Sequence, residues 1–165
     1  MPSPVRTFRD SVSPGAIPLA GIQGVIGYAN GRFAWTAAET ARFAAKGLQT
    51  AMVDVNGSAP ESACILDVER GDATPAQAPG WIRERNAFRG DATVYCDLST
   101  LPAVLAATAR VSGSWWLWLA HYTGHPHIPA VSLPANVRVM GCQYASFQAY
   151  DESCIVAGDW HRRAA

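Results

Sequence analysis

Eight short apolar runs, each long enough for one β-strand, follow one another along the 165 residues of this chain. They cover residues 7–12, 23–29, 48–55, 64–69, 92–96, 115–122, 137–144 and 152–156. Helical patterns lie only between some of them, at residues 37–46, 74–88 and 101–110. Strands that alternate with helices are parallel and joined by right-handed crossovers, and eight parallel strands suggest a closed barrel.

The length of the chain limits how complete such a barrel is. A barrel in which every strand has its helix normally needs about 250 residues, so several helices must be missing from a chain of 165. The early runs keep the alternation and the late runs lose it. We therefore expect an α/β fold, a degenerate TIM-like barrel that forms a single domain over residues 1–165.

Two of the expected helices have recognisable start signals. Thr36 and Glu39 form a capping box, and Gly47 is a C-terminal cap signal for the same helix. Thr74-Pro75 is typical of a helix start, with Pro79 restarting or kinking that helix. The strands at 48–55 and 64–69 are joined almost directly, with room for no more than one helical turn between them.

In a barrel of parallel strands, the site lies at the carboxyl ends of the strands. Asp151 lies just before the last run and can reach this mouth from a loop. Several carboxylates converging there are hard to explain as packing alone, because burial and like charge both disfavour the ionised form. Six further side chains lie at or near such ends: Asp10, Asp67, Glu69, Tyr95, Tyr122 and Gln143.

The run that ends in Asp67 and Glu69 carries the clearest chemistry. Residues i and i+2 of a strand point to the same face, so the two carboxylates are expected to project together. Like charges this close raise at least one pKa, and glycosidic bond cleavage needs one acid held protonated beside one held ionised. The alternative is a strand end at which the chain meets water and the carboxylates are structural.

The sixth run offers aromatic rings to the same mouth. Trp118, Ala120 and Tyr122 share one face of this strand. Aromatic rings there can bind the apolar face of a sugar, and core packing is the alternative. Gln143 in a strand interior needs hydrogen-bond partners, either in a structural network or through contact with a sugar or with Asp67.

Composition and charge exclude several classes of protein. The chain has 13 basic and 13 acidic side chains and a formal net charge of zero, so no basic field favours nucleic-acid binding. No apolar run is long enough to insert into a membrane as a spanning helix. His125-Pro126-His127 lacks a third ligand nearby, so we expect no metal and no cofactor. The four cysteines are expected to be buried free thiols: Cys64, Cys96, Cys142 and Cys154.

Taken together, these residues resemble glycoside hydrolase family 25, the muramidase or lysozyme family, and especially its short actinobacterial and phage relatives. The resemblance implies a barrel of five strand–helix units followed by three more strands. It also implies hydrolysis of the β-1,4 bond after N-acetylmuramic acid in peptidoglycan. The matching pieces span nearly the whole chain in the family's order: Asp10-Ser11, Leu66-Asp67-Val68-Glu69, Leu117-Trp118-Leu119-Ala120-His121-Tyr122, Gln143-Tyr144-Ala145 and Tyr150-Asp151.

The resemblance also assigns roles to residues. By the family's pattern, Glu69 is the general acid, and Asp67 assists the sugar's N-acetyl group or stabilises the oxocarbenium-like state. Asp10 and Asp151 complete the ring of carboxylates. Cys142 stands where the family usually has a tryptophan. The expected substrate contacts are Tyr28, Tyr95, Trp118, Tyr122 and Gln143.

The leading hypothesis is a monomeric N-acetylmuramidase, of which a phage endolysin is one form, acting on peptidoglycan or a related polysaccharide. One alternative is a non-enzymatic glycan-binding or phage structural protein that keeps the barrel, and another is a glycosidase for a different polysaccharide. Residues 1–6 lack the apolar core of a signal peptide, which predicts synthesis in the cytoplasm and action at the cell wall after release.

Overall fold

The computed structural model describes residues 5–158 and residue 160. Within these residues, eight strands form a closed barrel in the order of the chain. Neighbouring strands from β1 to β7 run parallel, whereas β8 runs antiparallel to both β7 and β1. The expected strands and their closure are therefore present, in a barrel that is mixed. The strands are β1 (Arg6–Asp10), β2 (Gly24–Tyr28), β3 (Gln49–Asp54), β4 (Ile65–Asp67), β5 (Thr93–Asp97), β6 (Trp115–Ala120), β7 (Val137–Ser146) and β8 (Asp151–Ile155).

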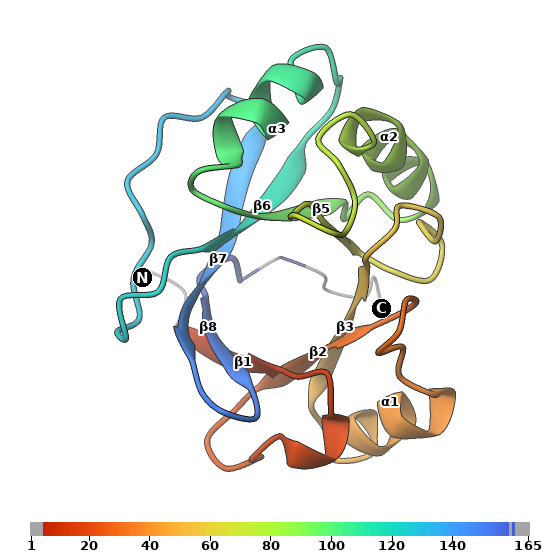
Figure 1. Ribbon diagram of the computed structural model, residues 1–165, viewed down its shortest axis with the longest axis vertical. Helices are drawn as coiled ribbons and strands as arrows, with labels where there is room; N and C mark the ends of the chain where they lie inside the picture. The colour runs from red at the N-terminus through yellow and green to blue at the C-terminus, as the bar shows by residue number, and fades with distance from the viewer. Residues whose placement is uncertain (1–4, 159, 161–165) are drawn as a thin grey trace.

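Three α-helices lie outside the ring of strands (Figure 1). They are α1 (Ala37–Ala44), α2 (Ala78–Phe88) and α3 (Leu101–Thr108), which follow β2, β4 and β5. A 3-10 turn, η1 (Pro14–Ala16), follows β1, and a loop follows β3. The described residues thus contain three strand–helix units, and the implied number of five is wrong. None of the described helices has the length and apolar character that a membrane span requires.

The start of α1 is decided by its local sequence. The Thr36 hydroxyl accepts a hydrogen bond from Glu39 N at 3.2 Å, and the Glu39 carboxylate accepts one from Thr36 N at 2.7 Å. The predicted capping box is therefore confirmed. Past the end of the helix, Gly47 takes a φ of 75°, a left-handed conformation that glycine adopts without strain.

α2 begins at Ala78, so its predicted start at Thr74-Pro75 is wrong. A hydrogen bond between two residues far apart in the sequence holds the preceding residues in a turn. Gln77 Oε1 accepts a hydrogen bond from Thr74 N at 2.9 Å, and Gln77 Nε2 donates to Asn56 O at 2.9 Å. Residues 74–77 therefore form a turn tied to the loop after β3. Pro79 lies in the first helical turn, where the missing N–H costs no helical hydrogen bond.

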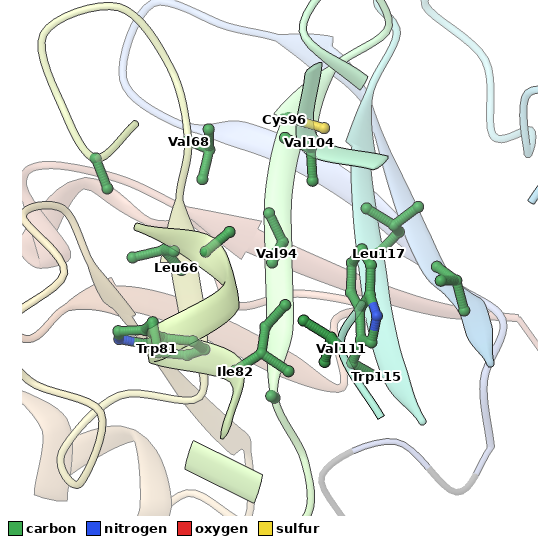
Figure 2. Packing of buried hydrophobic residues seen from close by; sticks show 14 of the residues in the cluster. Leu66, Val68, Trp81, Ile82, Val94, Cys96, Val104, Val111, Trp115 and Leu117 are labelled. Atoms are coloured by element: carbon green, nitrogen blue, oxygen red, sulfur yellow. The ribbon is translucent and has the colours of Figure 1, made fainter. Parts of the chain in front are cut away.

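Side chains alternate between two apolar layers, because successive residues of a strand point to opposite faces. The inner layer fills the barrel. The outer layer fills the space between β4, β5 and β6 and the helices α2 and α3, as Figure 2 shows. On β6 the alternation sends Trp116, Trp118 and Ala120 inward and Trp115, Leu117 and Leu119 outward.

The barrel interior is tightly filled at the end where the parallel strands begin. Trp160 is fully buried, and its Nε1 donates to Thr93 Oγ1 at 2.8 Å. A Cβ on Gly24 of β2 would lie 2.3 Å from the ring of Phe8. This Cβ would also lie 2.8 Å from the backbone oxygen of Gln49 on β3, so both an aromatic ring and a neighbouring strand require a glycine here. The opposite end of the barrel is the end that can receive a ligand.

All four cysteines are free and buried, as the sequence predicted. Cys142 of β7 and Cys154 of β8 lie opposite each other on the antiparallel pair. The Cys154 thiol donates to His127 O at 3.2 Å. Burial raises the pKa of Cys154, and it raises the pKa of Cys142 to about 12. Both thiols are therefore protonated and unreactive at neutral pH.

Candidate active site

One pocket lies at the end of the barrel where strands β1 to β7 finish. Its volume is about 110 Å³, and Ile26 and Val53 line it together with all nine residues that the sequence analysis singled out. The structure thus brings these side chains together, while their chemical roles stay predictions. The nine are Asp10, Tyr28, Asp67, Glu69, Tyr95, Trp118, Tyr122, Gln143 and Asp151.

The strands place the carboxylates at this mouth. Asp10 and Asp67 are the last residues of β1 and β4, and Glu69 lies two residues beyond β4. Because β8 runs antiparallel, Asp151 at its start lies at the same end as the other strands' last residues. Asp151 therefore belongs to a strand and not to the predicted loop, and Glu69 follows β4 without being part of it.

Gln143 of β7 is the centre of a hydrogen-bond network and is only 3% exposed. Its Oε1 accepts from the hydroxyls of Tyr95 at 2.7 Å and Tyr122 at 2.6 Å. Its Nε2 donates to Asp10 at 3.1 Å and to Asp151 at 3.3 Å. These four partners satisfy the amide completely. Of the alternatives that the sequence left open, the structural network is present, and Asp67 is not among the partners of Gln143.

Aromatic side chains form the floor and part of the rim of the pocket. Tyr95 and Trp118 are buried, with their ring centroids 4.5 Å apart. Trp118 Nε1 donates to Ser153 Oγ at 3.0 Å. Tyr122 is 54% exposed, so it can offer a ring face to a ligand. Tyr95 and Trp118 are buried and form the floor of the pocket.

A third acidic residue joins the Asp67–Glu69 pair. At least one oxygen of each of Asp67, Glu69 and Asp72 lies within 4.8 Å of the others. Asp67 is buried and its Oδ1 has no hydrogen-bond partner, whereas Glu69 is exposed. The turn after β4 folds Asp72 back, because Asp72 N donates to Glu69 O at 3.1 Å. Asp72 is not among the residues predicted from the sequence, although Gly71-Asp72 is a dipeptide typical of a turn.

Burial is the largest cause of the raised pKa values in the pocket. It raises the pKa of Asp67 to about 8, and the charges of Glu69, Asp72 and Asp10 add to this. It raises the pKa of Asp10 to about 7, and the charge of Asp151 adds to this. The pKa of Glu69 is raised by burial and then by the charge of Asp72. The sequence predicted that like charge raises at least one pKa of the Asp67–Glu69 pair; both pKa values are raised, with burial as the larger cause.

Asp67→Asn is expected to stabilise the protein at pH 8 by about 1–3 kcal/mol. The folded pKa of about 8 lies above the ordinary 3.8, so the wild type loses stability as pH rises from about 4 to about 8. Asparagine has no proton to release, so in the variant this contribution to the pH dependence of the free energy of unfolding is absent. Urea unfolding of both proteins across this range measures the effect, and parallel curves would contradict it.

Asp54, the last residue of β3, is a buried carboxylate that the sequence analysis did not single out. It accepts hydrogen bonds from the backbone N–H groups of residues 56–59, from Asn30 Nδ2 at 2.8 Å and from Trp81 Nε1 at 2.8 Å. Burial alone would raise the pKa of Asp54, but these hydrogen bonds outweigh burial and lower it. Asp54 therefore orders the loop between β3 and β4 and stays ionised.

Asp67, Glu69 and Asp72 form the one group in the described residues whose ligand atoms lie close enough to share a metal ion. Oxygen ligands of this kind suit a hard cation such as Mg²⁺ or Ca²⁺. His125 and His127, the two histidines considered in the sequence, do not belong to this group. His127 Nε2 instead lies 2.7 Å from His121 Nδ1.

Comparison with known proteins addresses the fold. No protein-family model and no curated protein matches the chain by sequence. Two solved structures match 93% of it with a TM-score of 0.55. One is a glycosyl hydrolase 25 of Streptococcus pneumoniae, described as a virulence factor that participates in host cell invasion, at 13% identity over 87% of its chain. The other is the bacterial lysozyme from Streptomyces coelicolor, at 14% identity over 93% of its chain.

The chain has the fold of the glycoside hydrolase family 25 lysozymes. The likeness covers nearly the whole chain, as the resemblance in sequence did. At 13–14% identity it establishes the architecture of this family 25 fold, and the chemistry has to be argued from the site.

Proposed function

We propose that the protein hydrolyses glycosidic bonds in bacterial cell-wall peptidoglycan, as an N-acetylmuramidase. The observation that carries this proposal is the Asp67–Glu69 pair, a buried carboxyl with a pKa of about 8 beside an exposed one at the mouth of a barrel. Glycoside hydrolysis uses two carboxyl groups, one of which is held protonated. The fold shared with two glycoside hydrolases agrees with this chemistry.

The geometry supports different chemical roles for the two carboxyl groups of the pair. Glu69 is the exposed member, so in this proposal it reaches the glycosidic oxygen and donates the proton to the leaving sugar. Asp67 lies deeper, and its unpartnered Oδ1 is free to accept the N–H of the sugar's N-acetyl group in either protonation state. Stabilisation of the oxocarbenium-like state requires the ionised form of Asp67, whose share rises as pH approaches its pKa of about 8. Asp10 and Asp151, oriented by Gln143, complete the acidic ring.

The closeness of the pair predicts the stereochemistry. An inverting pair needs about 6.5–9.5 Å between its carboxyl groups to hold a water molecule. One oxygen of Asp67 and one of Glu69 lie within 4.8 Å of each other, which is nearer to the roughly 5–5.5 Å between the carboxyl groups of a retaining pair. Hydrolysis is therefore expected to retain the configuration at the anomeric carbon, whether the nucleophile is a carboxylate or the substrate's own N-acetyl group.

Purified cell walls test the proposal. The wild type is expected to lower wall turbidity and to release fragments that end in a reducing N-acetylmuramic acid, with the retained anomer seen first by NMR. Release of N-acetylglucosamine ends would contradict the bond assignment. Initial formation of the other anomer would contradict the retaining pair.

Glycan binding without hydrolysis is the second candidate. The narrowness of the carboxylate pocket favours it, because about 110 Å³ is well below the roughly 300–1,000 Å³ of sites that enclose a ligand. A protein that sediments with cell walls but releases no fragments from any wall type would establish this function in place of the first.

A further inference from the structure

A second cavity lies beside the carboxylate pocket and is larger, with a volume of about 350 Å³. The two share Asp10, Tyr28 and Asp151 as common walls. The rest of the second cavity is formed by the segment after β1, from Ser11 to Ala16, and by the turn between β7 and β8 at residues 147–150. A ligand seated at the carboxylates can therefore continue into it.

The β7–β8 turn carries an aromatic surface on this cavity. The rings of Phe147 and Tyr150 are stacked, with centroids 4.8 Å apart and an interplanar angle of 26°. The Arg9 guanidinium lies 5.0 Å from the centroid of Tyr150 and is itself held by Glu152 at 2.7 Å. Phe147 remains 49% exposed, so it keeps ring surface for a ligand.

The turn is held in place before any ligand arrives. Ser11 Oγ donates to Ala149 O at 2.7 Å and joins the turn to the segment after β1. Phe147 N donates to Tyr150 O at 2.9 Å and closes the turn. A surface that is already ordered loses little conformational entropy on binding, which is what a recognition site requires.

We propose that this cavity is a second sugar subsite, in which Phe147 stacks on a pyranose ring of the glycan next to the ring over the carboxylates. The inference rests on the proposed function and extends it to substrate length. The cavity combines the aromatic ring and Val12, which is 47% exposed, with the polar groups of Asp10, Ser11 and Asp151. A pyranose has the matching character, with apolar C–H faces and a rim of hydroxyl groups.

The small size of the carboxylate pocket points the same way. At about 110 Å³ it can receive only part of a sugar, whereas about 350 Å³ falls within the range of cavities that hold small ligands. A polysaccharide that is cleaved at the carboxylates needs a neighbouring surface to bind its next sugar. The second cavity shares three lining residues with the first and supplies that surface.

The test compares Phe147→Ala with Phe88→Ala, a matched control of equal exposure, 49%, on α2. Calorimetry measures binding of a disaccharide and a tetrasaccharide of alternating N-acetylglucosamine and N-acetylmuramic acid. Phe147→Ala is expected to weaken tetrasaccharide binding about tenfold, as loss of an aromatic anchor does, and to remove its advantage over the disaccharide. Phe88→Ala is expected to bind as the wild type does.

A third variant separates stacking from folding. Phe147→Trp keeps a flat ring and is expected to retain tetrasaccharide affinity, and thermal melting checks that every variant is folded. Equal affinity of Phe147→Ala and Phe88→Ala would overturn the subsite, as would a wild type that does not bind the tetrasaccharide. A wild type that binds with the expected Phe147 dependence but hydrolyses no wall would leave the subsite standing and overturn the proposed activity.

Discussion

Glu69→Gln is expected to lower the rate of wall hydrolysis by about 10²–10⁴-fold, the usual effect of losing general acid catalysis. Glutamine keeps the length and hydrogen-bonding groups of glutamate but has no proton to give to the leaving oxygen. In the wild type, burial and the charge of Asp72 raise the pKa of Glu69, which keeps part of the population protonated near neutral pH. The rate should therefore fall as pH rises through that raised pKa.

The matched control for this prediction is Glu84→Gln, the same replacement at an exposed position of α2. It is expected to hydrolyse walls at the wild-type rate, and both variants are expected to remain folded in thermal melting. Wild-type activity in Glu69→Gln would show that Glu69 is not the acid. If Glu69→Gln kept its activity while Asp67→Asn lost it, the proton would come from Asp67, whose pKa is about 8.

Asp54→Ala is expected to lower the free energy of unfolding by about 3–5 kcal/mol, which is large for one substitution. The change leaves the buried Nε1 of Trp81 and the backbone N–H groups of the loop after β3 without their acceptor. Each buried donor left unsatisfied costs about 1–3 kcal/mol, and water reaches some of the loop groups in compensation. Urea unfolding at pH 7 measures the difference.

The pH dependence of this effect has a definite sign. The folded pKa of Asp54 is lowered, so its contribution is present above its unfolded pKa and is lost as pH falls through the folded value. The difference in the free energy of unfolding between the wild type and Asp54→Ala should therefore become smaller at acidic pH. Asp97→Ala is the control: Asp97 is exposed and accepts from Ser99 Oγ and Thr100 N, so the loss should be about 0.5–2 kcal/mol. An equal loss at both positions would contradict the special role of Asp54.

The sequence predicted most of the fold because its signals are local. Apolar runs bounded by turn residues gave the strands, and the Thr36–Glu39 capping box gave α1. The start of α2 was missed because the side chain of Gln77 bonds to Asn56 in a different loop, a contact that no local pattern contains. β8 runs antiparallel to β7 because only a short turn joins the two strands. That this direction brings Asp151 to the mouth of the barrel can be seen only in the structure.

The residues of the site were also predicted only in part. All nine expected residues line one pocket, since the carboxyl ends of parallel strands meet at one edge. Asp72 and Asp54 were missed for opposite reasons. Asp72 reaches the pair through a turn that reverses the chain, and Asp54, though also at a strand end, is fully used by hydrogen bonds within its own loop. A sequence shows that a carboxylate is present but not how many donors it meets.

The amide of Gln143 also decides which hydrogens the pocket can offer to a ligand. The hydroxyl hydrogens of Tyr95 and Tyr122 point to its Oε1, and its own two hydrogens point to carboxylates. Among the described residues that line the pocket there is no lysine, arginine or histidine. Its surface therefore accepts hydrogen bonds far more than it donates them, and it loses donors as its carboxyls ionise. Ligands rich in hydroxyl and amide N–H groups suit such a surface, whereas phosphorylated or sulfated glycans are repelled by it, increasingly so in alkali.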